Sequence, residues 1–257
     1  MALLVLAVAA GCRVTAVHVD HGLRPGSGAE AGAVDAVATR LGASFRAERV
    51  HVEPGPNLEA RARAARFSVL PPDVLTGHTA DDQAETVLLN LLRGAALDGL
   101  TGMGPGRHPL LRLRRAETRA LCAAEGIDPF EDPSNDDPSR RRNRVRHELV
   151  PLLCAIAERD VGAVLARQAE LLREDAELLV ALAAALDPTD AHALAAAPPP
   201  LARRAVRAWL QDGYPPGAAT VERVLDVARG RARATDVGGG RRVARSGGRL
   251  YLSEHGD

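Results

Sequence analysis

The chain has 257 residues, of which 46% are hydrophobic but only 2% aromatic, and its 33 basic residues balance its 33 acidic residues. That length suits one α/β domain with a smaller appendage, and no apolar run is long enough to span a membrane. Every basic residue is arginine, which excludes a lysine nucleophile, a Schiff base and a phosphate-binding loop of the GxxxxGK[ST] type.

The chain opens with the apolar stretch MALLVLAVAAGC, which resembles the core of an export signal. A signal peptide needs basic residues before its apolar part, and Met1 and Ala2 leave no room for them. An exported lipoprotein acylated at Cys12 is therefore the disfavoured alternative. Cys12, Cys122 and Cys154 share no metal-ligand spacing, which indicates free or buried thiols in a reducing cytoplasm.

The first half of the chain alternates predicted strands with predicted helices. The strands cover 13–20, 44–52 and 73–78, and the helices cover 26–42, 57–70 and 80–94, the last with Val87, Leu88, Leu91 and Leu92 as its core face. This order predicts an α/β fold with an open, doubly wound parallel sheet, in a domain that covers residues 1–150. Ligands of such sheets bind beyond the carboxyl ends of the strands.

The second half is predominantly helical. Gly, Pro and Arg are frequent from 94 to 135, with one short helix over 115–125, and a further helical stretch begins at 144. Apolar spacing predicts helices over 160–186, 198–212 and 220–230, and the tail over 241–252 reads as a β-hairpin with a Ser-Gly-Gly turn. Residues 151–257 are therefore expected to form a separate helical region with short terminal strands.

Three polar residues, His78, Asp82 and Glu85, are spaced i, i+4, i+7 at the start of the helix predicted over 80–94. The helical period places them on one face, where carboxylates suit Mg²⁺ or a cationic substrate group. The plainer alternative is that Asp81 and Asp82 only cap the helix and Glu85 is solvated. The stretch HVDHG, 18–22, is better explained by a turn at a strand end than by a hydrolase metal site, and no residue is assigned as a metal ligand.

Arginines are concentrated in two stretches of this neutral chain. Residues 138–147 hold five arginines and no acid, and residues 229–249 hold seven arginines against Asp236. A solvated surface would explain either stretch, but both together favour an anionic partner. Arg142, Asn143 and Arg146 lie within about one helical turn and offer hydrogen-bond donors suited to phosphates and base edges.

Several stretches in order resemble the tRNA(Ile)-lysidine synthase family of the N-type ATP pyrophosphatase superfamily. They are VHVDHGLRPGS, NLEARARAARF, TGHTADDQAETVLLNLLRG, GLTGMGP and EDPSNDDPSRRRNRVRHELVPLL. The resemblance implies that ATP adenylates the carbonyl oxygen of the wobble cytidine in a CAU anticodon of tRNA(Ile). The ε-amine of free lysine then attacks the ring carbon, and AMP departs.

The resemblance also implies cofactors, partners and residue roles. ATP and Mg²⁺ would be the cofactors, and tRNA(Ile) and free L-lysine would be the partners. Residues 151–257 would bind the tRNA. The resemblance implies no contact with a membrane and is compatible with a homodimer. Asp82 and Glu85 would position lysine or cytidine, and Arg142, Asn143 and Arg146 would contact the tRNA. The residues around the nucleotide would be Asp20, His21, Arg63 and His78.

The family's pyrophosphate loop, S-G-G-x-D-S, is expected just before residues that resemble MALLVLA, and the sequence as written does not contain it. We therefore expect no ATP- and lysine-dependent modification by the chain as written. A gene-start error is the preferred explanation, and a catalytically inactive remnant that only binds tRNA is the alternative. Related sulfur-transferring enzymes are disfavoured because the chain has no CxxC pair.

Overall fold

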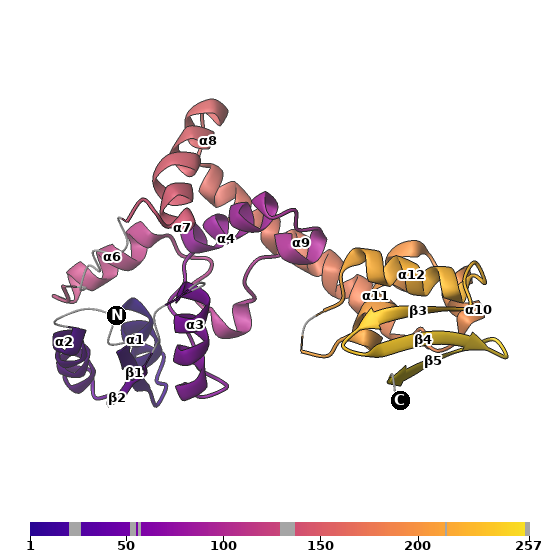
Figure 1. Ribbon diagram of the computed structural model, residues 1–257. Coiled ribbons are helices and arrows are strands. Elements are labelled where there is room, and N and C mark those ends of the chain that lie inside the picture. Colours follow the sequence, from indigo (N-terminus) through magenta and orange to yellow (C-terminus); the bar gives the residue numbers. More distant parts are fainter. Residues whose placement is uncertain (21–26, 52–54, 56–57, 129–136, 214, 255–257) are drawn as a thin grey trace. The chain divides into compact units, whose positions relative to one another are not determined.

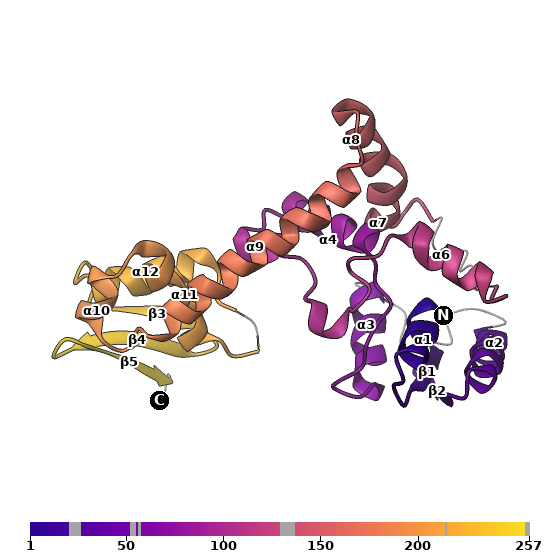
Figure 2. The same ribbon diagram turned by 180° about the vertical axis from the view of Figure 1, so that it is seen from behind.

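The computed structural model describes residues 1–257 except 21–26, 52–54, 56–57, 129–136, 214 and 255–257. The chain forms two compact units, unit 1 from Met1 to Glu170 and unit 2 from Leu171 to Asp257, drawn from two sides in Figures 1 and 2. The boundary lies inside one long helix. The predicted nucleotide-site residue His21 lies outside the described residues, as does residue 57, the first of the helix predicted over 57–70.

The sheet of unit 1 is a parallel pair of strands. Strand β1 (Thr15–Asp20) pairs in parallel with β2 (Ser44–Arg49), so that Thr15 lies opposite Ser44 and Asp20 opposite Arg49. Helix α2 (Ser27–Arg40) connects them and packs on both. Parallel strands need such a crossover because a tight turn cannot join them. The α/β class and the first two predicted strands are confirmed.

The predicted third strand, 73–78, is wrong. Among the described residues, the segment makes a single backbone hydrogen bond to a distant residue, from the Thr76 amide to the Arg107 carbonyl oxygen at 2.8 Å, and it forms no ladder with β1 or β2. Its Leu75 side chain is 47% exposed. A run of apolar residues gives an extended chain, but a strand also needs a hydrogen-bonded neighbour.

The helices of unit 1 pack around a small apolar core. They are α1 (Ala2–Ala9), α2, α3 (Leu58–Val69), α4 (Ala80–Leu92), α5 (Leu97–Leu100), η1 (Pro105–Arg107), α6 (Arg115–Ala124), α7 (Arg141–Arg144), the π-helical turn η3 (Val145–Leu149) and α8 (Val150–Ala157). Helix α1 packs against α6, as Figure 2 shows from behind. The core between them contains Ala2, Val5, Leu110, Cys122 and Ile127.

Helix α4 differs in part from its predicted core face. Val87 and Leu88 are buried as expected, but Leu91 is 55% and Leu92 67% exposed. The helix ends as predicted before Gly94, which has a φ of +78°. Helical spacing puts all four apolar side chains on one face, but burial also needs a packing partner, which the exposed side chains of Leu91 and Leu92 lack among the described residues.

Unit 2 has its own core between helices and a small antiparallel sheet. Helix α9 (Val161–Ala184) crosses the boundary, and α10 (Ala191–Ala196), α11 (Pro199–Leu210), α12 (Ala218–Ala228), β3 (Ala234–Gly238), β4 (Arg241–Ser246) and β5 (Arg249–Glu254) follow. The predicted hairpin is confirmed as β4 and β5, and β3 adds a third strand. Side chains of α10, α11, α12 and the sheet form the core. Within the described ranges no helix is long and apolar enough to cross a bilayer.

A candidate active site on helix α4 and the arginine-rich turn

The first carboxylate of the predicted acidic face, Asp82, both caps α4 and faces a group of arginines. Its Oδ2 accepts hydrogen bonds from the backbone amide and the hydroxyl of Thr79, each at 2.9 Å, which is a capping box. Its Oδ1 accepts from the Nη2 of Arg115 at 3.1 Å. The capping interpretation of Asp82 is therefore correct for one oxygen, and the other remains for ionic contacts.

The second carboxylate, Glu85, is buried rather than solvated, with a side chain that is only 3% exposed. Three guanidinium groups bond to it. Arg146 contacts it twice, from Nε to Oε1 at 2.7 Å and from Nη2 to Oε2 at 3.1 Å. Arg142 donates its Nε to Oε2 at 2.8 Å, and Arg115 donates its Nη2 to Oε1 at 3.0 Å. A buried carboxylate needs such partners because its desolvation is costly.

The same arginines link the two carboxylates into one cluster, named here the α4 ion cluster: Asp82, Glu85, Arg115, Arg142 and Arg146. Arg142 and Arg146 lie 3.3 and 3.5 Å from Asp82 Oδ1. Because they are four residues apart on α7 and η3, both reach α4 from one side. The acidic face and the arginine-rich stretch, 57 or more positions apart in the chain, are thus in direct contact.

Opposing effects act on the pKa of each carboxyl group in the α4 ion cluster. Burial would raise the pKa of Asp82, but the Thr79 amide and the charges of Arg115 and Arg142 hold it below its ordinary value. Burial would likewise raise the pKa of Glu85, and the hydrogen bonds from Arg146 and Arg142 lower it. Both groups are therefore carboxylates at neutral pH.

Asn143, for which an RNA contact is predicted, has a structural role in the fold. The residue is buried, and its Nδ2 donates to the Asp137 carbonyl oxygen at 2.9 Å. That bond fixes the chain that enters α7, whose first residue is Arg141. Asn143 thus holds the arginine-rich turn in place while Arg142 and Arg146 on either side of it face α4.

A hydroxyl joins two histidines beside the α4 ion cluster. Thr76 Oγ1 lies 2.6 Å from the Nδ1 of His78 and 2.5 Å from the Nδ1 of His108, and the rings pack edge to face at 4.8 Å. The hydroxyl has a single proton, so one ring accepts it and the other donates, which requires two different tautomers. Burial lowers the pKa of His78 to about 4, although the Asp82 charge acts in the opposite sense. His78 is therefore neutral at pH 7.

The remaining predicted residues, Arg63 and Asp20, make no direct contact with the α4 ion cluster among the contacts of the described residues. Arg63 stacks over Phe67 at 4.9 Å and lies near enough to His108 for its charge to lower that pKa, after burial, which is the larger cause. Asp20, at the end of β1, forms an ion pair with Arg49 of β2 at 3.9 Å. The structure thus gathers His78, Asp82, Glu85, Arg142 and Arg146, with Arg63 reaching them through His108.

Sequence reasoning missed Arg114, the N-cap of α6, and Arg115, its first residue. Arg114 contacts both oxygens of Asp81, at 2.7 and 3.2 Å, and also pairs with Asp160. Arg115 belongs to the α4 ion cluster. No local signal marks these two residues, because a helix N-terminus disfavours arginine unless an anion is near, and the anions come from another helix. The capping box of Thr79 and Asp82 was detectable from its spacing.

The donor set of the α4 ion cluster does not suit a divalent cation. Its two carboxylates are already bonded to guanidinium groups, and within the described ranges no three His, Cys, Asp or Glu side chains gather as metal ligands. Mg²⁺ in proteins is held by carboxylate and phosphate oxygens with several waters.

Comparison with protein families matches both halves of the chain. A model described as "PP-loop domain" matches residues 1–153, and one described as "TilS substrate binding domain" matches residues 190–251. The first match contains all of the α4 ion cluster, and the second contains the core of unit 2.

Curated proteins named tRNA(Ile)-lysidine synthase resemble the chain over most of its length. That of Nocardia farcinica is 47% identical over 229 residues, which are 82% of this chain and 72% of that protein. That of Rhodococcus erythropolis is 45% identical over 230 residues, which are 83% of this chain and 71% of that protein. That of Thermobifida fusca is 38% identical over 272 residues, which are 95% of this chain and 83% of that protein.

One solved structure gives an independent view of the fold. A U34-tRNA thiolase, NcsA from Methanococcus maripaludis, aligns with a TM-score of 0.50 over 67% of this chain and 69% of that one. The sequence identity is 18%, so the likeness concerns the fold alone.

Proposed function

The chain belongs to the tRNA(Ile)-lysidine synthase family, and from this premise we propose that its α4 ion cluster is the place where lysine meets the wobble cytidine. The reaction consumes ATP. The cytidine carbonyl oxygen attacks the α-phosphorus and pyrophosphate leaves. The lysine ε-amine then attacks the ring carbon, loses a proton, and AMP departs with the oxygen.

The charge balance of the α4 ion cluster suggests an order of binding. Two carboxylates face three guanidinium groups, which leaves a net charge of +1. A cationic ε-ammonium group is repelled by such a cluster, whereas a phosphate is attracted. We propose that tRNA phosphates bind first and draw Arg142 or Arg146 away from Asp82, at 3.3 and 3.5 Å, while both arginines stay bonded to Glu85. The released carboxylate then attracts lysine.

The two carboxylates have different access to a substrate. The Asp82 side chain is 16% exposed and Glu85 is 3% exposed. Asp82 is therefore the proposed partner of the lysine ε-ammonium. Glu85 is a positioning residue, which holds three guanidinium groups in a fixed array for the RNA. The single observation that carries this proposal is that all three arginines converge on Glu85.

The neutral histidine beside the α4 ion cluster has a proposed role near the nucleotide. His78 can accept or donate a hydrogen bond without adding positive charge, because its pKa is lowered to about 4, chiefly by burial. The charge of Arg63 acts on His108, and we propose that Arg63 contacts a phosphate of ATP. Mg²⁺, if it accompanies ATP, would be held mainly by phosphate oxygens, and Asp20 and His21 remain proposed borders of that region.

The second unit would hold the body of the tRNA. We propose that residues 151–257 contact tRNA(Ile), with the arginines of 229–249 facing its phosphates, and that the protein acts in the cytoplasm where its tRNA substrate is found. The fraction of affinity supplied by these charges is expected to fall as salt rises.

Calorimetry of lysine binding tests the proposal without requiring turnover. Lysine is titrated into the full chain alone and into the chain saturated with an RNA stem-loop that carries the CAU anticodon. We expect lysine to bind measurably more tightly when the stem-loop is present. Norleucine, which has the same four-carbon side chain as lysine but no ε-amine, should bind neither the chain alone nor its complex with the stem-loop.

Matched variants separate the proposed lysine contact from general charge effects. Asp82→Asn should abolish the RNA-dependent part of lysine binding, and Asp73→Asn, at an exposed aspartate, should leave it unchanged. Equal lysine affinity with and without the stem-loop would contradict the proposed order. Unchanged lysine binding by Asp82→Asn would contradict the proposed contact.

A further inference from the structure

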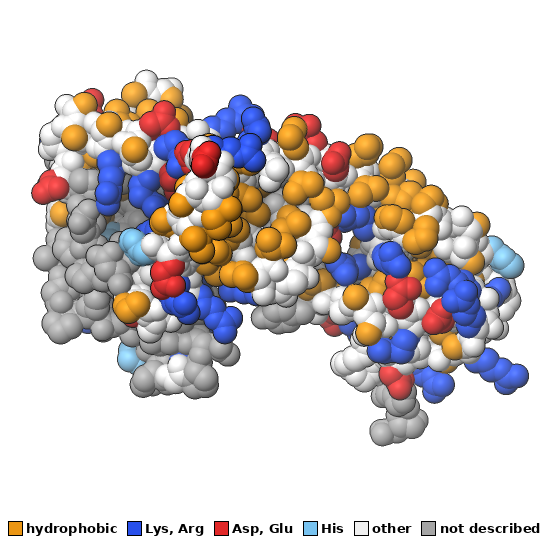
Figure 3. All heavy atoms as spheres, turned by 90° about the horizontal axis from the view of Figure 1, so that it is seen from above, with side chains coloured by type: hydrophobic (Ala, Val, Ile, Leu, Met, Phe, Trp, Pro, Cys, Tyr) orange, Lys and Arg blue, Asp and Glu red, His pale blue; other side chains and the backbone are white. Residues whose placement is uncertain are grey.

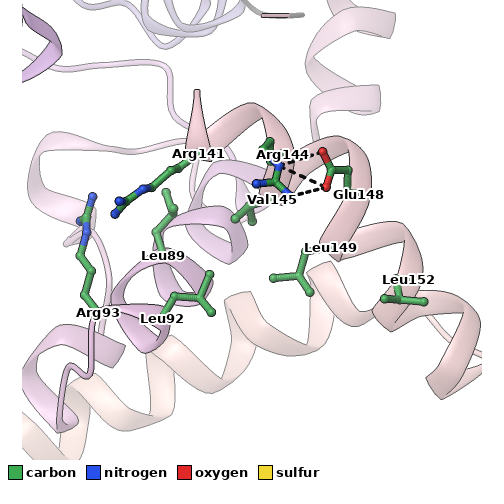
Figure 4. A pocket seen from close by; sticks show the side chains of 9 residues that line it. All are labelled: Leu89, Leu92, Arg93, Arg141, Arg144, Val145, Glu148, Leu149 and Leu152. Carbon is green, nitrogen blue, oxygen red and sulfur yellow. Dashed lines mark hydrogen bonds and ion pairs between the residues drawn. The ribbon is translucent and has the colours of Figure 1, made fainter. Parts of the chain in front are cut away.

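A groove lies one helical turn from the α4 ion cluster, between the end of α4 and the stretch from α7 to α8. Its volume is about 450 Å³, within the range of small-molecule pockets. We call it the α4–α8 groove. It belongs wholly to unit 1, and Figure 4 shows it from close by.

Leucines and one valine form the apolar part of the groove. Leu89 and Leu92 come from α4, Val145 and Leu149 from η3, and Leu152 from α8. Leu92 is 67% exposed and Leu152 is 56% exposed, so water reaches an apolar surface that would gain from being covered. In the surface view of Figure 3, hydrophobic side chains and arginines lie next to one another.

Three arginines and one glutamate form the polar part, for a net charge of +2. Arg144 pairs with Glu148, from Nε to Oε1 and from Nη2 to Oε2, each at 3.0 Å. Arg93 and Arg141 have no carboxylate partner within the described ranges. In Figure 4 both lie on the side away from Leu149 and Leu152, and the Arg141 side chain extends toward Arg93. The groove thus offers free guanidinium groups next to an apolar surface.

This combination of an apolar surface and arginines matches the two parts of a nucleotide, its base and its phosphate. A nucleobase out of its stack can lie against apolar side chains, and its flanking phosphates accept hydrogen bonds from arginines. A purely apolar ligand would leave Arg93 and Arg141 without partners, and a free anion would leave the leucines exposed. A single-stranded segment of RNA satisfies both.

The groove and the α4 ion cluster are built on the same helices. Leu89 follows Glu85 by four residues, a rise of about 6 Å along α4. Arg141 faces the groove, and its neighbour Arg142 bonds to Glu85. We infer that the α4–α8 groove binds one unstacked nucleotide of the tRNA anticodon loop next to the modified cytidine, with its phosphates on Arg93 and Arg141. This inference rests on the proposed function.

A second copy of the chain is the competing occupant, and charge disfavours it. A two-fold interface brings the same patch of each copy together. Here that would place two patches of net charge +2 face to face and bury arginines without partners, which costs free energy.

Anisotropy of a labelled CAU stem-loop tests the inference on the full chain. Arg93→Gln and Arg141→Gln should each weaken binding about fivefold near 0.1 M salt and lower the slope of log K against log salt by about 0.7. Arg13→Gln, at an exposed arginine of the same unit, is the matched control and should change neither value. If the groove variants behave like the control, the inference is overturned.

An abasic RNA identifies the nucleotide. Leu92→Gln should weaken binding of the intact stem-loop but not of a stem-loop that lacks the base on one side of the wobble cytidine. Equal losses for the intact loop and for each abasic loop would overturn the inference. If sedimentation shows that Leu92→Gln turns a dimer into a monomer, the groove is an interface between copies and the inference is wrong.

Failure of the proposed function would give a different pattern. In that case the unsubstituted chain would bind the CAU stem-loop no better than one whose wobble cytidine is replaced by uridine. If the unsubstituted chain does prefer the CAU stem-loop while the groove variants lose nothing, the proposed function stands and the groove inference alone fails.

Discussion

The two ends of helix α4 use arginine in opposite ways. At the first end, three arginines are bonded to Asp82 and the buried Glu85. At the last end, Arg93 and the neighbouring Arg141 face an open apolar groove without a carboxylate partner in the described part of the chain. The same residue type is therefore bonded to carboxylates at one end, whereas at the other end it has no such partner among the described residues.

The difference teaches that arginine count alone does not locate an RNA-binding surface. Burial separates the two uses, because a guanidinium that satisfies a buried carboxylate is costly to remove, whereas an exposed one contributes little to stability. Substitutions at the two ends should therefore separate folding from binding.

The largest effect is expected for Glu85→Gln. This change leaves three guanidinium groups around a single carboxylate and should lower the free energy of unfolding by about 3 kcal/mol. Urea denaturation measures the loss. Glu125→Gln, at an exposed glutamate, is the matched control and should lie within about 0.5 kcal/mol of the unsubstituted chain. A loss as small as that of the control would show that the cluster does not stabilise the fold.

Arg146→Gln should have a smaller effect, near 2 kcal/mol, because Arg115 and Arg142 still neutralise Glu85. The double variant with Glu85→Gln should lose less than the sum of the single losses. Urea denaturation of all four chains completes the cycle. Additive losses would mean that Glu85 and Arg146 act independently, contrary to the contacts described.

His78 is expected to make the stability of the fold depend on pH, with an effect of intermediate size. Its folded pKa of about 4 lies below the ordinary value of 6.5, so the unfolded chain binds more protons between these values. The stability from neutral His78 is full above pH 6.5 and is lost as the pH falls toward 4. Asp82 and Glu85 lose theirs only at lower pH, because their pKa values are lowered from about 4.

Thermal unfolding between pH 7 and pH 4 checks this expectation. His78→Asn should flatten the curve between pH 6.5 and 4 but not abolish its slope, because the pKa of His108 is also lowered by burial and by Arg63 and Arg107. An unchanged slope in His78→Asn would show that folding does not lower the pKa of His78.

The smallest effect on stability is expected for Arg93→Gln and Arg141→Gln. Both side chains are exposed, so each change should alter the free energy of unfolding by no more than about 0.5 kcal/mol. Urea denaturation of the proteins used for RNA binding provides the measurement. A large loss at either position would place that arginine in the folding core and remove the contrast between the two ends of α4.

Much of the fold could be predicted because local spacing decides it. The bounds of β1, β2, α4 and the final hairpin follow from apolar period, glycine stops and turn residues. The extended segment 73–78 could not be told from a strand, since a ladder depends on a neighbour elsewhere in the chain. The exposure of Leu91 and Leu92 likewise depends on where other helices end.

Most residues of the candidate site could be predicted from the sequence, but the ion pairs between them could not. Spacing placed Asp82 and Glu85 on one face and Arg142 and Arg146 on another. It could not indicate that these faces neutralise each other, or that Asn143 is buried against Asp137. Arg115 gave no signal because its partners come from α4, 30 residues or more away. Long-range ion pairs are set by packing, which no local pattern contains.

A photo-crosslink tests most directly whether the wobble cytidine lies at the α4 ion cluster. A CAU stem-loop with 5-iodocytidine at the wobble position is bound to the full chain, irradiated and digested, and the attached peptide is identified by mass spectrometry. The account predicts attachment to peptides from 76–94 or 141–153. Attachment only to residues 171–257 would contradict it.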